Sequence, residues 1–335
     1  MTAETGRLAG GAGVRGFLVQ HGPGILRTYG IVFALVVLVI GVTANNPTFL
    51  TSTNIYNMLS QWAPAGIMAI GMTYVILTGG FDLSIAAGYS LCAVTAAGLG
   101  QGGASPAMCF LAAIGVGLVL GIVNGGLVSL IGINPFIATV GSGFIMSGVT
   151  LLITDNKAYI VDDPSFATLG GGDIGGFPYA GMLLIGLMVI GGFILARSVY
   201  GQWIYAVGGN REASRLSGIR SQLTEASTYV VSGLCMGIAG IITASQLSSA
   251  QADIDPDIVF DVITIVVVGG TSLAGGIGSM WRSAIGLGLI ATITNAFSLL
   301  DLNPFYQDLA KGFIIVGALA LDVWSRRLAR RAAIA

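Results

Sequence analysis

The sequence predicts an all-α protein that crosses a membrane about ten times. The chain has 335 residues, of which 54% are hydrophobic and 9% are charged, whereas soluble domains carry about 25% charged residues. Long apolar runs recur along the whole chain. Because a transmembrane helix needs about 20 predominantly apolar residues, we expect the spans at roughly 29–43, 61–77, 85–99, 107–130, 136–153, 179–196, 226–244, 258–268, 285–299 and 309–323. The amphipathic run 49–59 is expected to lie at the membrane interface.

The distribution of charge predicts which ends of the spans face the cytoplasm. With the N-terminus inside and ten crossings, every arginine falls on one face. The longest loop on the other face holds four aspartates and one lysine between 155 and 173. Because cytoplasmic loops carry an excess of basic residues, both termini are expected inside. The chain then divides into a cytoplasmic tail (1–28), a transmembrane domain (29–324) with a polar cytoplasmic loop at 197–220, and a basic cytoplasmic tail (325–335).

Residues 201–220 form the one sizeable polar and basic stretch between apolar runs. Asn210 can cap a helix by accepting a hydrogen bond from a free amide of the first turn. Glu212 near the start and Arg215 further along suit the helix dipole, and Gly218 fits the left-handed position that ends many helices. These residues predict a capped helix of about two turns.

A helix of this length is too short to be stable alone in water, so it needs a surface to lie against. Ala213 and Leu216, three residues apart, give it a small apolar face. On helix chemistry alone, an ordinary capped loop and a docking surface for another protein fit equally well.

Glycines interrupt the apolar runs at some places and allow close packing of helices at others. The motifs GGFDLS (79–84) and GGTSLAGG (269–276) interrupt helices near the cytoplasmic ends of spans and leave backbone groups that need partners. Gly117, Gly121 and Gly125 recur every fourth residue, a pattern typical of closely packed membrane helices. The segments 124–136 and 295–305 both end in Asn-Pro-Phe on opposite faces, which indicates an inverted repeat of the kind found in alternating-access carriers.

Acidic residues near membrane depth are costly and normally have a partner or a function. Asp82 either caps the next helix, the slightly favoured alternative, or contacts a substrate. Asp261 either begins a span at the outer surface or lines a pathway. Asp308 and Lys311 lie three apart on one helical face, and we expect them to pair.

Several classes of chemistry are missing from the sequence. The chain has no G-x-x-x-x-G-K-[ST] motif, and neither of its lysines, Lys157 and Lys311, stands in such a context. No nucleophile–base pair and no metal-ligand spacing is evident. We therefore expect the chain to be no enzyme and to bind no cofactor itself.

Five ordered motifs together resemble one family. The family is that of the ribose-type ABC sugar permeases, the membrane subunits of bacterial carbohydrate importers, and the resemblance runs from about 49 to 322. The motifs are VILTGGFDLS (75–84), NPFIATVG (134–141), YAVGGNREASRLSGI (205–219), LSSAQ (247–251) and VVVGGTSLAGGIGS (266–279).

The resemblance implies partners and a location. Two permease subunits, identical or different, form the channel in the bacterial inner membrane lipid; a cytoplasmic ABC ATPase binds ATP and Mg²⁺; and an extracytoplasmic binding protein delivers the sugar. No nucleic acid is involved. In this family the basic loop meets the ATPase, which favours docking and assigns that contact to Gly208, Gly209, Asn210, Arg211, Glu212, Ala213, Arg215, Leu216 and Gly218.

Along the pathway of the solute, polar side chains are expected to bind its hydroxyl groups, and one apolar side chain is expected to form a wall. The candidates are Asp82, Asn124, Phe136, Gln246, Asp261 and Asn295. The asparagines fit contacts between helices equally well. The alternatives are a branched-chain amino acid permease of a related importer, an ion-coupled secondary transporter using Asp82 and Asp261, and a membrane scaffold that transports nothing.

Overall fold

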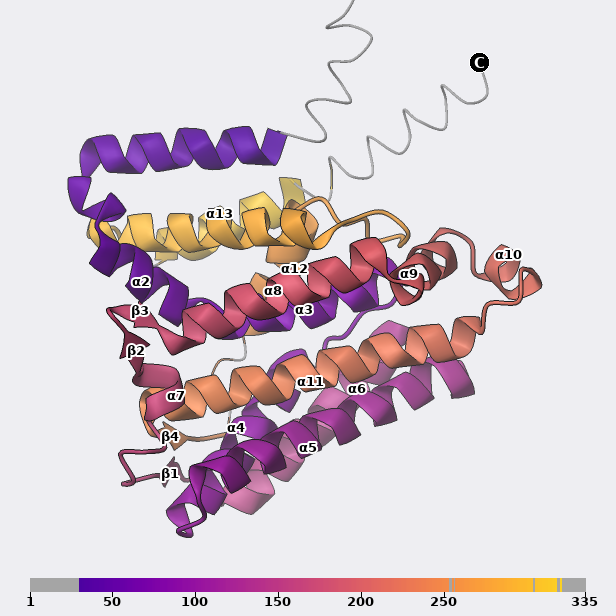
Figure 1. Ribbon diagram of the computed structural model, residues 1–335, viewed down its shortest axis with the longest axis horizontal. Coiled ribbons are helices and arrows are strands. Elements are labelled where there is room, and N and C mark those ends of the chain that lie inside the picture. Colours follow the sequence, from indigo (N-terminus) through magenta and orange to yellow (C-terminus); the bar gives the residue numbers. More distant parts are fainter. Residues whose placement is uncertain (1–29, 253–254, 256, 304, 318–319, 321–335) are drawn as a thin grey trace, which may run out of the picture.

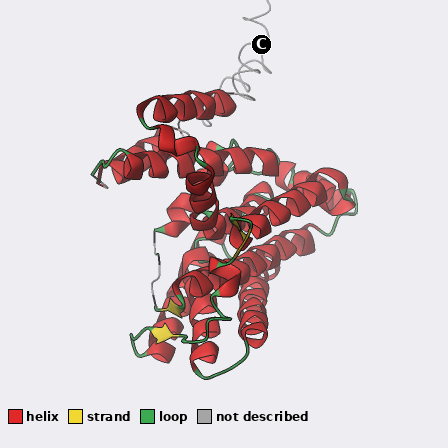
Figure 2. Cartoon of the chain, turned by 60° about the vertical axis from the view of Figure 1, so that its left-hand side comes forward, coloured by secondary structure: helices red, strands yellow, loops and turns green. Residues whose placement is uncertain are grey.

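The computed structural model describes residues 30–252, 255, 257–303, 305–317 and 320, and within them the chain is almost entirely helical (Figures 1 and 2). The two predicted tails, 1–28 and 325–335, lie outside the described residues. The helices are Gly30–Asn45, η1 (Pro47–Leu50), α2 (Ser52–Gln61), α3 (Ala63–Leu77), α4 (Ile85–Gln101), α5 (Pro106–Gly125), the π-helical η2 (Gly126–Ile131), α6 (Pro135–Thr154), α7 (Thr168–Gly171), α8 (Tyr179–Arg197), α9 (Val199–Gly209), α10 (Arg211–Leu216), α11 (Ser221–Leu247), α12 (Ile258–Val268), α13 (Met280–Leu299) and residues 305–317.

Each of the ten predicted spans overlaps at least one of these helices. Among the described residues, four helical segments are long and apolar enough to cross a membrane, at Pro106–Ile131, Pro135–Thr154, Tyr179–Arg197 and Ser221–Leu247, and three more apolar helices are shorter. The prediction of a polytopic helical membrane protein is confirmed, and the number of crossings stays a prediction. The tenth span extends past 317, where residues 318–319 and 321–323 lie outside the described part of the chain.

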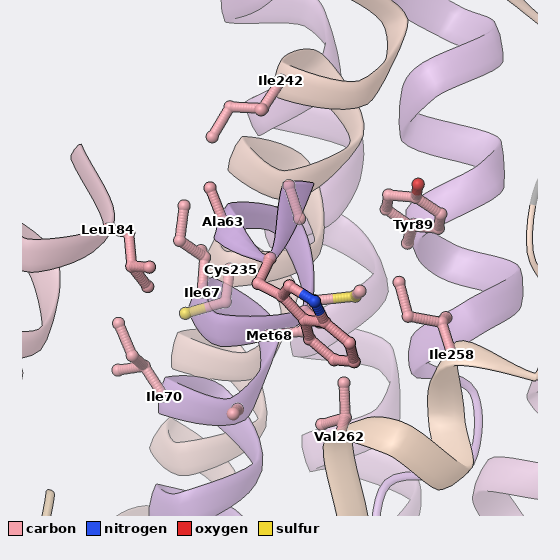
Figure 3. Close-up of a cluster of buried hydrophobic side chains, with 14 of the residues drawn as sticks. Ala63, Ile67, Met68, Ile70, Tyr89, Leu184, Cys235, Ile242, Ile258 and Val262 are labelled. Carbon is pink, nitrogen blue, oxygen red and sulfur yellow. The ribbon is translucent and has the colours of Figure 1, made fainter. Parts of the chain in front are cut away.

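Helix α3 lies at the centre of the molecule. All of its 15 residues are buried, as its apolar composition on every side requires. Figure 3 shows Ile67 and Ile70 on α3 directed toward Leu184 of α8, while Ile258 and Val262 of α12 approach from the other side. The helix spans only about 22 Å at 1.5 Å per residue, and it ends in the GGFDLS motif.

The longest helix, α11, packs beside α3 and most extensively against α5. The three regularly spaced glycines of α5 make this contact close. A Cβ at Gly121 would lie 2.8 Å from the Cα of Val230, and one at Gly125 would lie 2.6 Å from the Ala226 carbonyl oxygen. Backbones this close leave no room for side chains, so the packing predicted from the glycine spacing is confirmed.

The molecule has two distinct ends along its helices (Figure 1). Helices α9 and α10 lie at one end, where Arg197, Arg211 and Arg215 are found. The strands lie at the other end, beside the loop with the aspartates: β1 (Tyr159–Ile160) pairs antiparallel with β4 (Ser249–Ala250), and β2 (Asp173–Ile174) with β3 (Phe177–Pro178). This separation of charge agrees with the predicted orientation.

The asparagine and the phenylalanine of each Asn-Pro-Phe segment form the same hydrogen bond. The amide of Phe136 donates to the Asn134 side chain at 3.0 Å, and the amide of Phe305 donates to that of Asn303 at 2.9 Å. The first turn lies near the α10 end. The second follows α13, whose last turn contacts Asn46 and α2 at the opposite end. Their opposite placement is what an inverted repeat requires.

The amphipathic run 49–59 is helical but interrupted. It begins within η1 and continues in α2, and the two are separated by the extended residue Thr51, whose side chain caps α2 by accepting from the Asn54 amide. Its expected place at the membrane interface stays a prediction.

Candidate functional site

Helix α10 is built by local hydrogen bonds, as its sequence predicts. The Asn210 side chain accepts from the amide of Ala213 at 2.9 Å. At the other end Gly218 has φ +86°, and its amide donates to the Arg215 carbonyl while the Ile219 amide donates to the Ser214 carbonyl. This pair of bonds is the Schellman arrangement, which satisfies the last carbonyls of a helix.

The apolar face of α10 has no partner among the described residues. Leu216 is 76% exposed, and Ala213 beside it is also exposed. Exposed leucine at the tip of a polar loop is available for contact with another protein.

Two of the charged residues of α10 bind each other. The Arg215 guanidinium donates to both carboxylate oxygens of Glu212, at 2.6 and 3.1 Å. Both side chains are 65% exposed. The hydrogen bonds from Arg215 hold the pKa of the Glu212 carboxyl below its usual range, so the carboxylate is ionised at neutral pH.

The third charge, Arg211, anchors α10 to the membrane domain. It forms an ion pair of 2.7 Å with Glu225, a residue of α11 whose side chain is only 6% exposed. The hydroxyl of Ser221 also donates to the Arg211 carbonyl. The sequence analysis missed Glu225; an isolated acid one and a half turns into an apolar helix was the signal that it needed a basic partner.

The two glycines that precede α10 have different surroundings. A Cβ at Gly208 would overlap the Leu77 carbonyl oxygen and lie 2.5 Å from the Gly276 amide nitrogen, whereas a Cβ at Gly209 would meet open space. The end of α9 therefore lies directly against the last residue of α3 and against the second glycine motif, 269–276.

The loop Gly79–Ser84 between α3 and α4 is held by partners from three helices. The Asp82 carboxylate is fully buried and accepts from Ser84 Oγ at 2.5 Å, from the Ser84 amide at 3.2 Å and from Ser232 Oγ of α11 at 2.7 Å. The amide of Leu83 donates to Thr139 Oγ1 of α6. Asp82 thus binds Ser84, the residue that precedes α4, and α4 itself has no side-chain cap. A role of Asp82 as a cap or in substrate contact stays a prediction.

Asn124 joins the same group of side chains from α5. Its Nδ2 donates to Ser84 Oγ at 2.8 Å, and it is fully buried. Its Oδ1 accepts from no described residue. Asp82 and Asn124, two predicted pathway residues, thus meet at one serine.

A cleft of about 520 Å³ opens beside this loop. It is lined by Gly79, Phe81, Leu83, Asn134, Pro135, Phe136 and Ile263. Phe136 is 59% exposed, and its role as an apolar wall stays a prediction. Phe81 was missed by the sequence analysis, although its place between a glycine pair and an aspartate was visible.

The remaining predicted pathway residues lie toward the strand end and do not meet one another. Gln246 donates to the carbonyl and the hydroxyl of Ser60. Asn295 and Asn54 exchange two amide hydrogen bonds, at 2.9 and 3.0 Å.

The predicted pairing of Lys311 with Asp308 is wrong. Lys311 binds Asp261 of α12 at 2.8 Å, and both side chains are 19% exposed. The ammonium also lies 5.9 Å from the centre of the Trp62 ring. A charge on an apolar helix gains most from a partner that is shielded from water with it, and Asp261, the lone acid within an apolar run, satisfies that condition.

Comparison with known proteins agrees with this arrangement. The family model for the branched-chain amino acid transport system / permease component matches residues 54–319. A ribose import permease protein of Bacillus subtilis (strain 168) is 37% identical over 304 residues, which cover 90% of this chain and 94% of that protein.

Two further relatives come from Escherichia coli (strain K12). Its ribose import permease protein is 34% identical, with 86% of this chain and 91% of that protein covered. Its L-arabinose transport system permease protein is 33% identical, with 90% and 92% covered. No solved structure matches the chain. With apolar helices and relatives matched over nearly their whole length, the chain belongs to the ribose-type permease family of bacterial ABC importers, the multi-pass subunits of the inner membrane.

Proposed function

We propose that this chain passes a sugar or polyol across the inner membrane, driven by a separate ATPase that docks on α10. The sugar class is supported by the relatives, which are named for ribose and L-arabinose. The family model is named for branched-chain amino acids, so these are the competing solute class.

The observation that carries the proposal is the exposed, fully capped helix α10 with its unpartnered Leu216. A short helix held in shape by its own caps can be pushed as a rigid unit. It is joined to α9 on one side and, through residues 217–220, to the 27-residue α11 on the other. The Arg211–Glu225 ion pair adds a second connection to α11.

The mechanism follows from this connection. When ATP closes the ATPase, α10 is displaced, and α11 moves with it as a rigid body. Helix α11 packs against α3, α4 and α5, so its tilt changes the pathway between them. A separate binding protein that captures the sugar allows the permease to hold it weakly.

The predicted pathway residues then act at different points. Phe136 contacts the sugar directly in the cleft, where an aromatic ring can pack on the apolar face of a sugar. Asp82 and Asn124 hold the loop beside the cleft. Gln246, Asp261 and Asn295 act nearer the strand end, where the solute would enter. Two copies of the chain, or this chain and a related one, complete the channel.

Reconstitution tests the proposal. The permease is placed in liposomes with its ATPase, with ATP on the ATPase side and the cognate binding protein on the other. We expect uptake of ribose, arabinose or a related sugar that needs all three components, and no uptake of leucine. Uptake driven by a proton or sodium gradient without the ATPase would contradict the proposal, and leucine uptake would reassign the solute.

A further inference from the structure

Three glycine pairs from distant parts of the chain meet between the end of α9 and the cleft. They are Gly79–Gly80, Gly208–Gly209 and Gly275–Gly276, and we call them the glycine joint. The amide of Gly276 donates to the Leu77 carbonyl at 2.9 Å. The last residue of α3, the loop after α12 and the end of α9 therefore touch through backbone atoms.

The close approach explains why these positions are glycine. A Cβ at Gly275 would lie 2.9 Å from the Gly79 amide nitrogen and 3.0 Å from the Gly208 carbonyl oxygen. Gly275 and Gly276 also have φ of +82° and +72°, a region that other residues rarely adopt. Gly208 has no such conformation, so contact alone excludes a side chain there.

Two tyrosine hydroxyls reinforce the joint. Tyr205 of α9 donates to the Gly278 carbonyl at 3.0 Å, and Tyr229 of α11 donates to the Phe81 carbonyl at 3.1 Å. Each bond ties a helix next to α10 to the backbone of a loop that carries or follows one of the glycine motifs. Backbone atoms in direct contact cannot adjust by a change of side-chain rotamer. A shift of α9 therefore displaces the other segments of the joint as well.

The joint also borders the cleft. Gly79 belongs to both, and Phe81 and Leu83 of the same loop line the cleft together with Asn134 and Phe136. Ile263 lines it from α12, the helix that leads into the second glycine motif. Movement of the joint therefore changes the width of the cleft.

We infer that the glycine joint carries the displacement of α9–α10 to the loop Gly79–Ser84 and so opens and closes the cleft, which is the cytoplasmic exit for the sugar, with Phe81 and Phe136 as its gate. This inference rests on the proposed function. It assigns the joint a positioning role, separate from docking of the ATPase.

The first test compares a glycine of the joint with a glycine outside it, in the complete transporter. Gly208→Ala places a methyl group in the joint, whereas Gly186→Ala on α8 places one in open space. We expect Gly208→Ala to keep the ATPase bound and to lower sugar uptake about tenfold or more, with Gly186→Ala close to wild type. Unchanged uptake in Gly208→Ala, equal damage by both variants, or loss of ATPase binding in proportion to uptake would each overturn the inference.

The second test measures the gate and does not depend on Gly208→Ala folding. Phe136→Cys is introduced without the three native cysteines, and its labelling by a thiol reagent is followed from the cytoplasmic side with and without ATP. We expect the labelling rate to change at least about threefold with ATP, as it does when a closed site becomes exposed. Phe144→Cys, on an exposed part of the same helix, should not respond.

Equal rates at Phe136→Cys in both states would refute the gate. These outcomes are separate from failure of the proposed function, which would appear as a wild-type complex that takes up no sugar with ATP.

Discussion

Helix α10 and the loop Gly79–Ser84 lie at the same end of the molecule but are stabilised in opposite ways. The bonds that shape α10 join residues no more than five apart, from Asn210 to Ala213 and from Ile219 to Ser214. The bonds that shape the loop reach across the chain: Asn124 is 40 residues from Ser84, and Ser232 is 150 residues from Asp82.

The difference shows how the two regions can have separate functions, α10 in docking and the loop Gly79–Ser84 in gating. A helix that is shaped by its own caps and tied to α11 through Arg211 can present a surface to a partner and tolerate changes there. A loop held by three helices responds when any of them moves. The first property suits docking, and the second suits a gate, so substitutions in the two regions should have different effects.

The largest expected effect tests whether both regions face the cytoplasm. Ser214 is buried within α10 and is a poor reporter, whereas Ser217 is exposed. In a background without native cysteines, Ser217→Cys should not react with a membrane-impermeant thiol reagent added to intact cells, and Asp162→Cys, on the aspartate loop, should react fully. Reaction of Ser217→Cys without reaction of Asp162→Cys would place α10 outside the cell. The two regions would then not face the cytoplasm as the comparison requires.

The next effect concerns the interior that supports the loop. A side chain at Gly117 would overlap the Gly233 carbonyl oxygen of α11, whereas Gly115 on the same helix has open space around it. We expect Gly117→Leu to cost about 1–3 kcal/mol or more and to leave little folded permease after detergent extraction. Gly115→Leu is the control and should extract at wild-type levels. Equal yields would show that α5 and α11 do not pack this closely.

The same contrast explains what could be predicted from the sequence. The helices, their approximate bounds and the caps of α10 follow from local patterns of apolar residues, prolines and capping side chains. The Gly117, Gly121 and Gly125 spacing predicted close packing but could not name α11 as the partner, because that contact joins residues more than 100 apart.

The local structure of the predicted docking helix follows from its sequence, whereas the arrangement of the predicted pathway residues does not. Asp82, Asn124 and Phe136 do gather around one loop, yet nothing local to them indicates that Ser84 and Ser232 complete the group. Lys311 was assigned to Asp308 because the two share a helical face. Its bond to Asp261 depends on how two distant helices pack, and spacing along one helix carries no information on that.

A third prediction separates docking from folding. Leu216 is 76% exposed and takes no part in the caps of α10. A buried apolar anchor at an interface is worth about 2 kcal/mol, so Leu216→Asp should lower ATPase co-purification about tenfold or more, with the amount of permease unchanged. Leu216→Met keeps the apolar volume and should retain the complex. Normal binding by Leu216→Asp would remove α10 from the interface.

A fourth prediction concerns the ion pair between Arg211 of α10 and Glu225 of α11. Arg211→Ala leaves the nearly buried Glu225 carboxylate without its partner. Breaking a buried pair costs about 3–5 kcal/mol, and because Arg211 is 51% exposed we expect the lower cost of about 1–3 kcal/mol. Uptake per bound ATPase should fall.

The double variant Arg211→Ala/Glu225→Gln, which removes the unpaired charge, should recover thermal stability but not uptake. Recovery of both would mean that the pair is needed for folding alone and transmits nothing from α10 to α11.

The smallest effect is expected from the exposed pair Glu212–Arg215. Each side chain is 65% exposed and bound to the other, and exposed pairs contribute little to stability. Because Arg215 lowers the pKa of Glu212, the contribution is present above the ordinary pKa of glutamate, about 4.3, and is lost only as the pH falls through the lowered value. Stability should therefore not vary with pH near neutrality on account of this pair.

The pair can contribute to binding of the ATPase. For this, Glu212 and Arg215 have to release each other and bind charged groups of the ATPase instead. Glu212→Ala and Arg215→Ala should each weaken ATPase co-purification by less than the tenfold expected for Leu216→Asp, since exposed charge contacts are weak. The exchange Glu212→Arg/Arg215→Glu distinguishes two causes. It preserves the pair within α10 but presents the opposite charges to the ATPase. Wild-type binding of the ATPase by this double variant would show that the pair acts inside the helix. Weaker binding than that of either single variant would show that the pair contacts charged groups of the ATPase.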